Sequence, residues 1–209
     1  MMFDEKMIDA LRARLAGEIS EFRFRHTLGV EKEAVRLGEL YAPEKIPLLR
    51  AAALLHDITK ENSFEKQLQL CSDLGIMVRD SENKSPKTLH AITGAAVIER
   101  DFPEFADPEL VSAVRWHTTG KENMSICDKI IYLADYIEEN RQFDDCVWLR
   151  RYFWDGKPEK MASPDRLDHL SRTLVISFDM TIRALEEEGA VIDENTLKAS
   201  KYLVRFGSQ

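Results

Sequence analysis

The sequence is poor in cysteine, glycine and proline, and it lacks any long hydrophobic run. Its three cysteines, Cys71, Cys127 and Cys146, are too few and too widely spaced for a disulfide framework or a paired-cysteine zinc site, and they fit a reducing compartment. Residues 1–17 mix charges into their apolar positions, and no segment reaches the roughly 20 apolar residues that span a bilayer. We therefore expect a cytoplasmic protein without a membrane partner.

Basic residues are outnumbered by acidic ones. There are 29 Lys and Arg against 37 Asp and Glu, so the formal net charge is −8. Most of the surface would repel a nucleic-acid backbone, which excludes nucleic acid as a partner but not a small phosphate ligand in a local basic pocket. The 209 residues, 44% of them hydrophobic, supply the core of one compact domain over residues 1–209.

Apolar residues recur at helical spacing almost throughout the chain. No sustained apolar–polar alternation predicts a strand, so we predict an all-α fold. Residues 75–87 have the composition of a loop, and the pattern does not assign residues 141–163. The predicted helices span residues 4–17, 21–41, 46–59, 63–74, 88–101, 108–118, 125–140, 164–188 and 194–206.

Several helix ends have a recognisable signal. Asp107 and Ser163 each precede a proline, which is the pattern of a capping side chain before the first helical turn. Gly189 follows a run of glutamates as a helix end, and Asp193 can cap the last helix.

Two acidic residues stand in segments that are otherwise apolar enough to be buried. His56 and Asp57 close the segment 51–58 (AAALLHDI), and Asp135 is the one acid in residues 130–137 (IIYLADYI). A buried carboxylate needs a cation or several hydrogen-bond donors. His56 and Asp57 could satisfy each other or a helix end, and Asp135 could pair with Arg141, but a metal ion would satisfy both acids.

Four of the five histidines fall on different predicted helices. Their spacing excludes a zinc finger and a helical HExxH site, so a shared site would have to be assembled at the centre of a helical bundle. These four histidines are His26, His56, His90 and His117.

Other polar residues receive no role in such a site. The fifth histidine, His169, lacks an apolar context and is predicted to be a surface residue. The pair Arg150 and Arg151 is typical of a solvated face. Cys127 and Cys146 have no neighbouring base that would make them nucleophiles.

The order of His26, His56, Asp57 and Asp135 resembles the pattern of the HD superfamily of metal-dependent phosphohydrolases, which are all-α proteins named for an adjacent His-Asp pair. The local sequence words are similar to those of its YqeK family, strongly over about residues 20–141. The matching words are residues 56–60 (HDITK), 89–95 (LHAITGA), 116–120 (WHTTG) and 128–138 (DKIIYLADYIE).

The resemblance implies a helical bundle with a metal site at its centre. It implies one iron ion held by His26, His56, Asp57 and Asp135. A mixed nitrogen and oxygen shell also suits manganese or another divalent transition metal. Histidines at the places of His90 and His117 bind a second metal in other HD proteins, so one or two ions remain open.

The resemblance also implies a reaction, the symmetrical hydrolysis of diadenosine tetraphosphate to two ADP by metal-activated water. Catalytic roles would then fall on Asp57, Lys60, His90 and His117. The sequence has Glu139 where the family usually has proline, which bears on how Arg141 approaches the site. The implied nucleotide contacts are Arg23, Lys60, His90, His117, Thr118 and Arg141.

Three alternatives for function and assembly stay open at this point. The same metal core would serve a nucleoside monophosphate or deoxynucleoside triphosphate phosphohydrolase. A non-catalytic nucleotide sensor would keep the pocket but has little need of every metal ligand. A homodimer is also compatible with the sequence.

Overall fold

The computed structural model describes residues 3–79 and 85–206, and within these ranges it contains α-helices and short 3₁₀-helices but no strand. The all-α prediction is confirmed. The helices are α1 (Glu5–Glu18), α2 (Glu21–Tyr41), α3 (Ile46–Leu55), α4 (Phe64–Asp73), α6 (Leu89–Asp101), α7 (Pro108–Trp116), α8 (Ile126–Ile137), α9 (Asp144–Asp155), α10 (Ser163–Glu187) and α11 (Glu194–Phe206). The 3₁₀-helices are η1 (Pro43–Lys45), η2 (Pro86–Thr88), η3 (Pro103–Phe105) and η4 (Pro158–Lys160).

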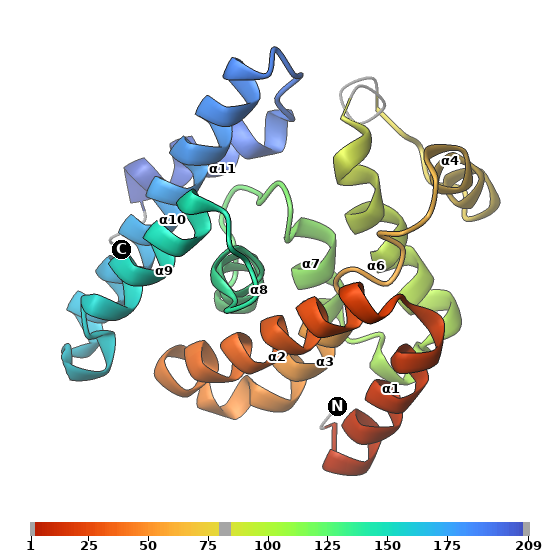
Figure 1. Ribbon diagram of the computed structural model, residues 1–209, viewed down its shortest axis with the longest axis horizontal. Coiled ribbons are helices and arrows are strands. Elements are labelled where there is room, and N and C mark those ends of the chain that lie inside the picture. Colours follow the sequence, from red (N-terminus) through yellow and green to blue (C-terminus); the bar gives the residue numbers. More distant parts are fainter. Residues whose placement is uncertain (1–2, 80–84, 207–209) are drawn as a thin grey trace.

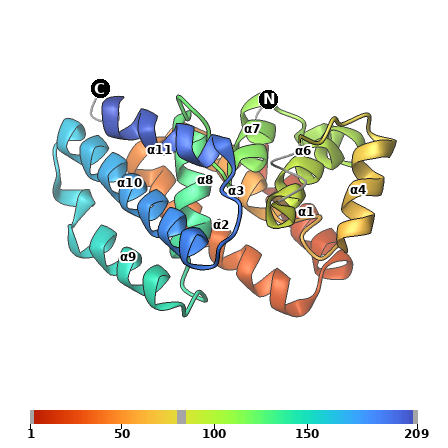
Figure 2. The same ribbon diagram turned by 90° about the horizontal axis from the view of Figure 1, so that it is seen from above.

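Helices α2, α3, α7 and α8 form the middle of the molecule. Helix α2 packs on α3 and α8, and α7 packs on α3, α6 and α8. Helices α4 and α6 lie at one end, whereas α9, α10 and α11 lie at the other (Figures 1 and 2). The described part of the chain has no helix that is both long and apolar enough to cross a bilayer.

The core is continuous across the middle of the molecule. Helix α3 is apolar on nearly every side, and its residues from Leu48 to Leu55 are buried except Arg50. Burial on all sides is the expected place for so apolar a helix. It carries the chain to His56 and Asp57 inside the fold, which are 0% and 4% exposed.

Most of the predicted helix-end signals act as expected. The Asp107 side chain accepts a hydrogen bond from the backbone N–H of Glu109, and Asp193 does the same for Asn195. Gly189 has a positive φ of 64°, which glycine adopts without steric cost. The prediction for Ser163 is wrong, because Ser163 is already helical, the cap residue is Ala162, and no side chain caps this helix.

Two central helices end earlier than predicted. Helix α3 ends at Leu55 and not at residue 59, since Ile58 and Lys60 donate to the carbonyls three residues before them and the chain continues as turns. Helix α8 ends at Ile137 and not at residue 140, because Glu138 has an extended backbone. These early ends place Asp57 and Lys60 on turns and Arg141 directly after a turn.

The segment that the sequence did not assign contains helix α9 and η4. Arg150 of α9 donates hydrogen bonds to the carbonyls of Ile137, Glu138 and Arg141. The expectation of a solvated face is therefore wrong for Arg150, whereas Arg151 is exposed. Helix α9 thus fastens the turn that follows α8.

The expectations for His169 and for the loop 75–87 are confirmed only in part. His169 is not a plain surface residue, since it is partly buried, its Nε2 lies 2.9 Å from the carbonyl oxygen of Phe153, and its ring stacks on that phenyl ring. Of the predicted loop 75–87, residues 76–79 form no regular structure, residues 80–84 lie outside the described ranges, and η2 begins at its end.

Candidate active site

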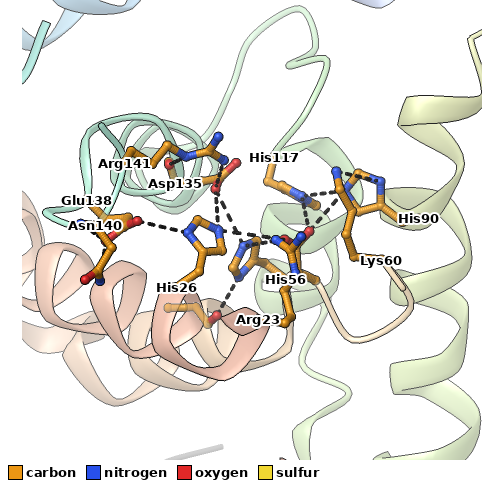
Figure 3. Close-up of polar contacts among 12 residues, drawn as sticks. Arg23, His26, His56, Lys60, His90, His117, Asp135, Glu138, Asn140 and Arg141 are labelled. Atoms are coloured by element: carbon orange, nitrogen blue, oxygen red, sulfur yellow. Dashed lines mark hydrogen bonds and ion pairs between the residues drawn. The ribbon is translucent and has the colours of Figure 1, made fainter. Parts of the chain in front are cut away.

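The structure brings the predicted metal ligands together from α2, the turn after α3, and α8 (Figure 3). Nε2 of His26 lies 3.0 Å from Oδ1 of Asp135 and 3.7 Å from Oδ2 of Asp57. Nε2 of His56 lies 3.4 Å from Oδ2 of Asp57 and 3.7 Å from Oδ1 of Asp135. The four side chains thus surround one point in the middle of the bundle.

Asp57 also faces the other two histidines. Its Oδ1 lies 3.1 Å from Nε2 of His90 and 3.5 Å from Nε2 of His117, and these two nitrogens are 3.1 Å apart. Potential ligand atoms therefore lie close enough for a metal in three overlapping groups, which are His26 with His56 and Asp57, His56 with His117 and Asp135, and Asp57 with His90 and His117.

Carbonyl oxygens at helix ends orient two of the imidazole rings. His56 and His117 each follow the last residue of a helix, where carbonyl oxygens lack partners within the helix. Nδ1 of His56 lies 2.6 Å from the carbonyl oxygen of Ala53, and Nδ1 of His117 lies 2.7 Å from that of Val114. With Nδ1 directed at a carbonyl, Nε2 is the nitrogen that faces the cluster and would bind a metal.

The acidic residues have cationic partners as well. A guanidinium nitrogen of Arg23 is 2.5 Å from Oδ2 of Asp57. Arg141 donates through Nε to the carbonyl of Asp135 and through Nη2 to its Oδ1, both at 2.6 Å. The expected ion pair between Asp135 and Arg141 is therefore present, and it lies beside the histidines.

These charges shift the pKa values of the site. Burial favours the neutral form of Asp57, but the charge of His56 and the nearby imidazoles of His117 and His90 outweigh it and hold its pKa well below the usual range. Burial likewise opposes a charged Asp135, but Arg141 and His26 lower its pKa. Burial would depress the pKa of His56, yet Asp57 and Asp135 raise it to about 10. The cluster is built to hold positive charge.

Three buried polar atoms indicate that the cluster binds a cation. Within the described ranges, Nε2 of His26, Nε2 of His56 and Oδ1 of Asp57 have no hydrogen-bond partner. A buried polar atom without a partner is costly, and such an atom in a native structure calls for an explanation. Imidazole nitrogen and carboxylate oxygen are ligands of iron, manganese and zinc. The residues present therefore fit a divalent transition metal.

Lys60 and His90 form a second side of the site. Nζ of Lys60 lies 3.1 Å from Nε2 of His90. Burial lowers the pKa of Lys60, and burial lowers the pKa of His90 to about 4. Thr118 follows His117, and its buried Oγ1 has no hydrogen-bond partner in the described part of the chain.

Sequence reasoning missed Glu138 as a residue of the site. Its Oε1 lies 3.0 Å from Nδ1 of His26. The available signal was its spacing, because Glu138 follows Asp135 by three residues. Cys127 and Cys146 have no place in this cluster, and burial raises the pKa of both thiols, which agrees with the absence of a nucleophilic role.

Comparison with known proteins identifies the family. Residues 23–140 match the model of the HD domain. The chain is 37% identical over 186 residues to the symmetrical bis(5'-nucleosyl)-tetraphosphatase of Halalkalibacterium halodurans, covering 89% of this chain and 91% of the relative. It is 28% identical over 187 residues to the protein of the same name from Bacillus subtilis, covering 90% and 92%.

A solved structure agrees with these relatives. The crystal structure of a predicted HD superfamily hydrolase involved in NAD metabolism from Clostridium acetobutylicum superposes with a TM-score of 0.80 at 31% identity, covering 98% of this chain and 99% of that chain. The resemblance inferred from the sequence words is confirmed, since relatives of this kind span nearly the whole chain. With its helical bundle, its central His-Asp cluster and the matched residues 23–140, this chain belongs to the HD-domain family.

Proposed function

We propose that this protein is a metal-dependent phosphohydrolase that cleaves diadenosine tetraphosphate symmetrically to two ADP. Two observations carry the proposal together. A relative that is 37% identical over nearly its whole length is named a symmetrical bis(5'-nucleosyl)-tetraphosphatase, and this chain has a buried His-Asp cluster suited to a metal.

In this proposal one metal ion is held by His26, His56, Asp57 and Asp135. A divalent transition metal bound there would supply a Lewis acid for a phosphoryl oxygen and would acidify water to give a nucleophile near neutral pH. Iron is the ion that we propose, with manganese as the substitute that the same donor set accepts. If a second ion binds, His90 and His117 are its ligands, and elemental analysis distinguishes the two cases.

Cationic side chains hold the polyphosphate beside the metal. Arg23 contacts Asp57 and Arg141 contacts Asp135, and a guanidinium has five N–H donors, so donors remain for phosphoryl oxygens. The buried Nε of Arg23 has no hydrogen-bond partner among the described residues. Together with Lys60, the two arginines would form a local basic pocket, which explains how a chain of net charge −8 could bind an anionic substrate.

The remaining proposed contacts act on the reacting phosphates. His90 and His117 lie beside Asp57 and are placed to donate hydrogen bonds to phosphoryl oxygens and to the oxygen of the departing ADP. Lys60 lies close to His90, and its positive charge would offset the negative charge that develops on the oxygen of the departing ADP. Thr118 adds a hydroxyl donor.

We further propose that residues 1–209 form a single HD domain, with the metal and nucleotide core at about 20–141 and a C-terminal helical part at 142–209. A nucleotide or dinucleoside polyphosphate is the expected ligand. A cytoplasmic location and a homodimer stay predictions.

Product analysis tests the proposal. The protein loaded with Fe²⁺ or Mn²⁺ is incubated with diadenosine tetraphosphate, with AMP and with dATP, and the products are separated by ion-exchange chromatography. Two ADP and no AMP or ATP from the dinucleotide is the expected result. AMP with ATP would overturn the symmetrical cleavage. Nucleoside from AMP or triphosphate from dATP as the dominant activity would identify another HD phosphohydrolase, and tight binding without turnover would identify a sensor.

A further inference from the structure

His26 obtains its hydrogen-bond partner differently from the other metal-facing histidines. His56 and His117 lie just past helix ends, where free carbonyl oxygens accept from Nδ1. His26 lies inside α2, where the backbone carbonyls of the preceding turn accept helical hydrogen bonds. Its Nδ1 therefore needs a partner from another element, and that partner is the carboxylate of Glu138, 3.0 Å away.

The Glu138 carboxylate is held in one orientation (Figure 3). Glu138 is 1% exposed. Its Oε2 accepts from the backbone N–H of Asn140 at 2.6 Å and from Nδ2 of Asn140 at 2.9 Å. Gly29 of α2 lies against the same end of the side chain, since an added Cβ there would come within 2.1 Å of Oε2 and 2.7 Å of Nδ2 of Asn140. The two donors occupy Oε2, so Oε1 is the oxygen that faces His26.

We propose that Glu138 is a positioning residue for the metal site. By accepting the hydrogen of Nδ1, it keeps His26 in the tautomer whose Nε2 is unprotonated and directed at Asp57 and Asp135. Gly29 and Asn140 serve the same end, because they fix the carboxylate. The inference rests on the metal site of the proposed function and is independent of which nucleotide is cleaved. Loss of such a partner weakens metal binding by about 10- to 100-fold.

Replacing Glu138 with glutamine tests the tautomer directly. Both Asn140 donors need an acceptor, so the amide oxygen of the new side chain must take the place of Oε2. Its NH₂ group then faces Nδ1 of His26, which has to become an acceptor and carry its hydrogen on Nε2. Glu138→Gln keeps the size of the side chain yet blocks the ligand atom. The matched control is Glu139→Gln, which removes the same charge from an exposed neighbour paired with Lys32.

Replacing Gly29 with alanine perturbs the same carboxylate without changing Glu138 itself. The new Cβ must displace the end of the Glu138 side chain, which breaks its contact with His26. Alanine also favours the helix by about 1 kcal/mol relative to glycine. Gly29→Ala is therefore expected to keep the fold while it weakens metal binding. The control is Gly17→Ala in α1, where an added Cβ meets nothing within 4 Å.

The measurement is the Kd of the metal-free protein for Co²⁺, obtained by competition with a chromophoric chelator, alongside urea unfolding without metal. We expect Glu138→Gln and Gly29→Ala to raise this Kd by about 10- to 100-fold, with both controls unchanged. Folded Glu138→Gln and Gly29→Ala proteins with the wild-type Kd would overturn the inference. Failure of the wild type itself to bind Co²⁺ would instead refute the metal site of the proposed function.

Discussion

Replacing Asp57 with asparagine keeps the shape of the side chain but removes the negative charge at the centre of the site. All four clustered imidazoles lie within 3.7 Å of its carboxylate oxygens, and Arg23 contacts it as well. Asparagine offers one neutral oxygen where the carboxylate offers two charged ones. The variant is therefore expected to lose metal binding while the surrounding helices stay folded.

The size of the effect follows from binding linkage. A ligand present at 100 times its Kd stabilises the folded state by about 2.7 kcal/mol. In a chain of 209 residues, 1 kcal/mol shifts the melting temperature by about 2–4 °C, so Mn²⁺ at that level should raise the wild-type Tm by about 5–11 °C. The expected rise for Asp57→Asn is close to zero.

The assay is thermal unfolding of metal-free protein with and without MnCl₂. Each variant is compared with itself, so a change in the Tm of the metal-free form does not affect the result. Asp9→Asn is the control, since Asp9 is an exposed carboxylate of α1 that is paired with Arg12 and is not part of the His-Asp cluster. An Asp57→Asn protein that gains as much from Mn²⁺ as the wild type would refute the reasoning.

Three further substitutions test the surroundings of the site. Arg141→Lys replaces the two hydrogen bonds that the guanidinium donates to Asp135. Since a hydrogen bond to a charged group contributes about 1.5–3 kcal/mol, kcat/KM for diadenosine tetraphosphate should fall about 10- to 100-fold. Arg150→Met removes three hydrogen bonds to the turn after α8 and should lower Tm by about 3–6 °C, for a loss of roughly 1.5 kcal/mol. Ser125→Ala breaks a capping box and should lower Tm by about 2–4 °C, for about 1 kcal/mol.

Each of these variants has a clear control or counter-result. Arg151→Met removes the same charge from an exposed neighbour and should leave Tm unchanged, so equal losses in both arginine variants would contradict the role of Arg150. Ser163→Ala should also be neutral, because that hydroxyl caps no helix. Wild-type turnover by Arg141→Lys would remove Arg141 from the proposed machinery.

The residues of the site that could be predicted from the sequence are charged side chains whose burial without a partner would be unfavourable. Asp57 and Asp135 stand among apolar residues, and a carboxylate in that position needs a positive partner wherever the chain folds. Four histidines on separate helices in a chain with five pointed to one shared centre. The structure places these residues around that centre.

The parts that could not be predicted depend on main-chain groups brought together by packing. Arg150 binds three carbonyl oxygens of a turn that exists only because α8 stops at Ile137, and no side-chain pattern encodes those partners. Helix α9 was missed for a related reason. It buries only Cys146, Leu149 and Phe153, so its apolar stripe is narrow. Glu138 was missed because a glutamate near a helix end is ordinarily exposed.

The most direct test of the whole account is anomalous diffraction from crystals of the protein grown with Mn²⁺. The account predicts a manganese peak among Nε2 of His26, Nε2 of His56 and the carboxylates of Asp57 and Asp135. A map without a peak at this point, or with the metal bound elsewhere while these four side chains pair only with one another and with the arginines, would contradict it.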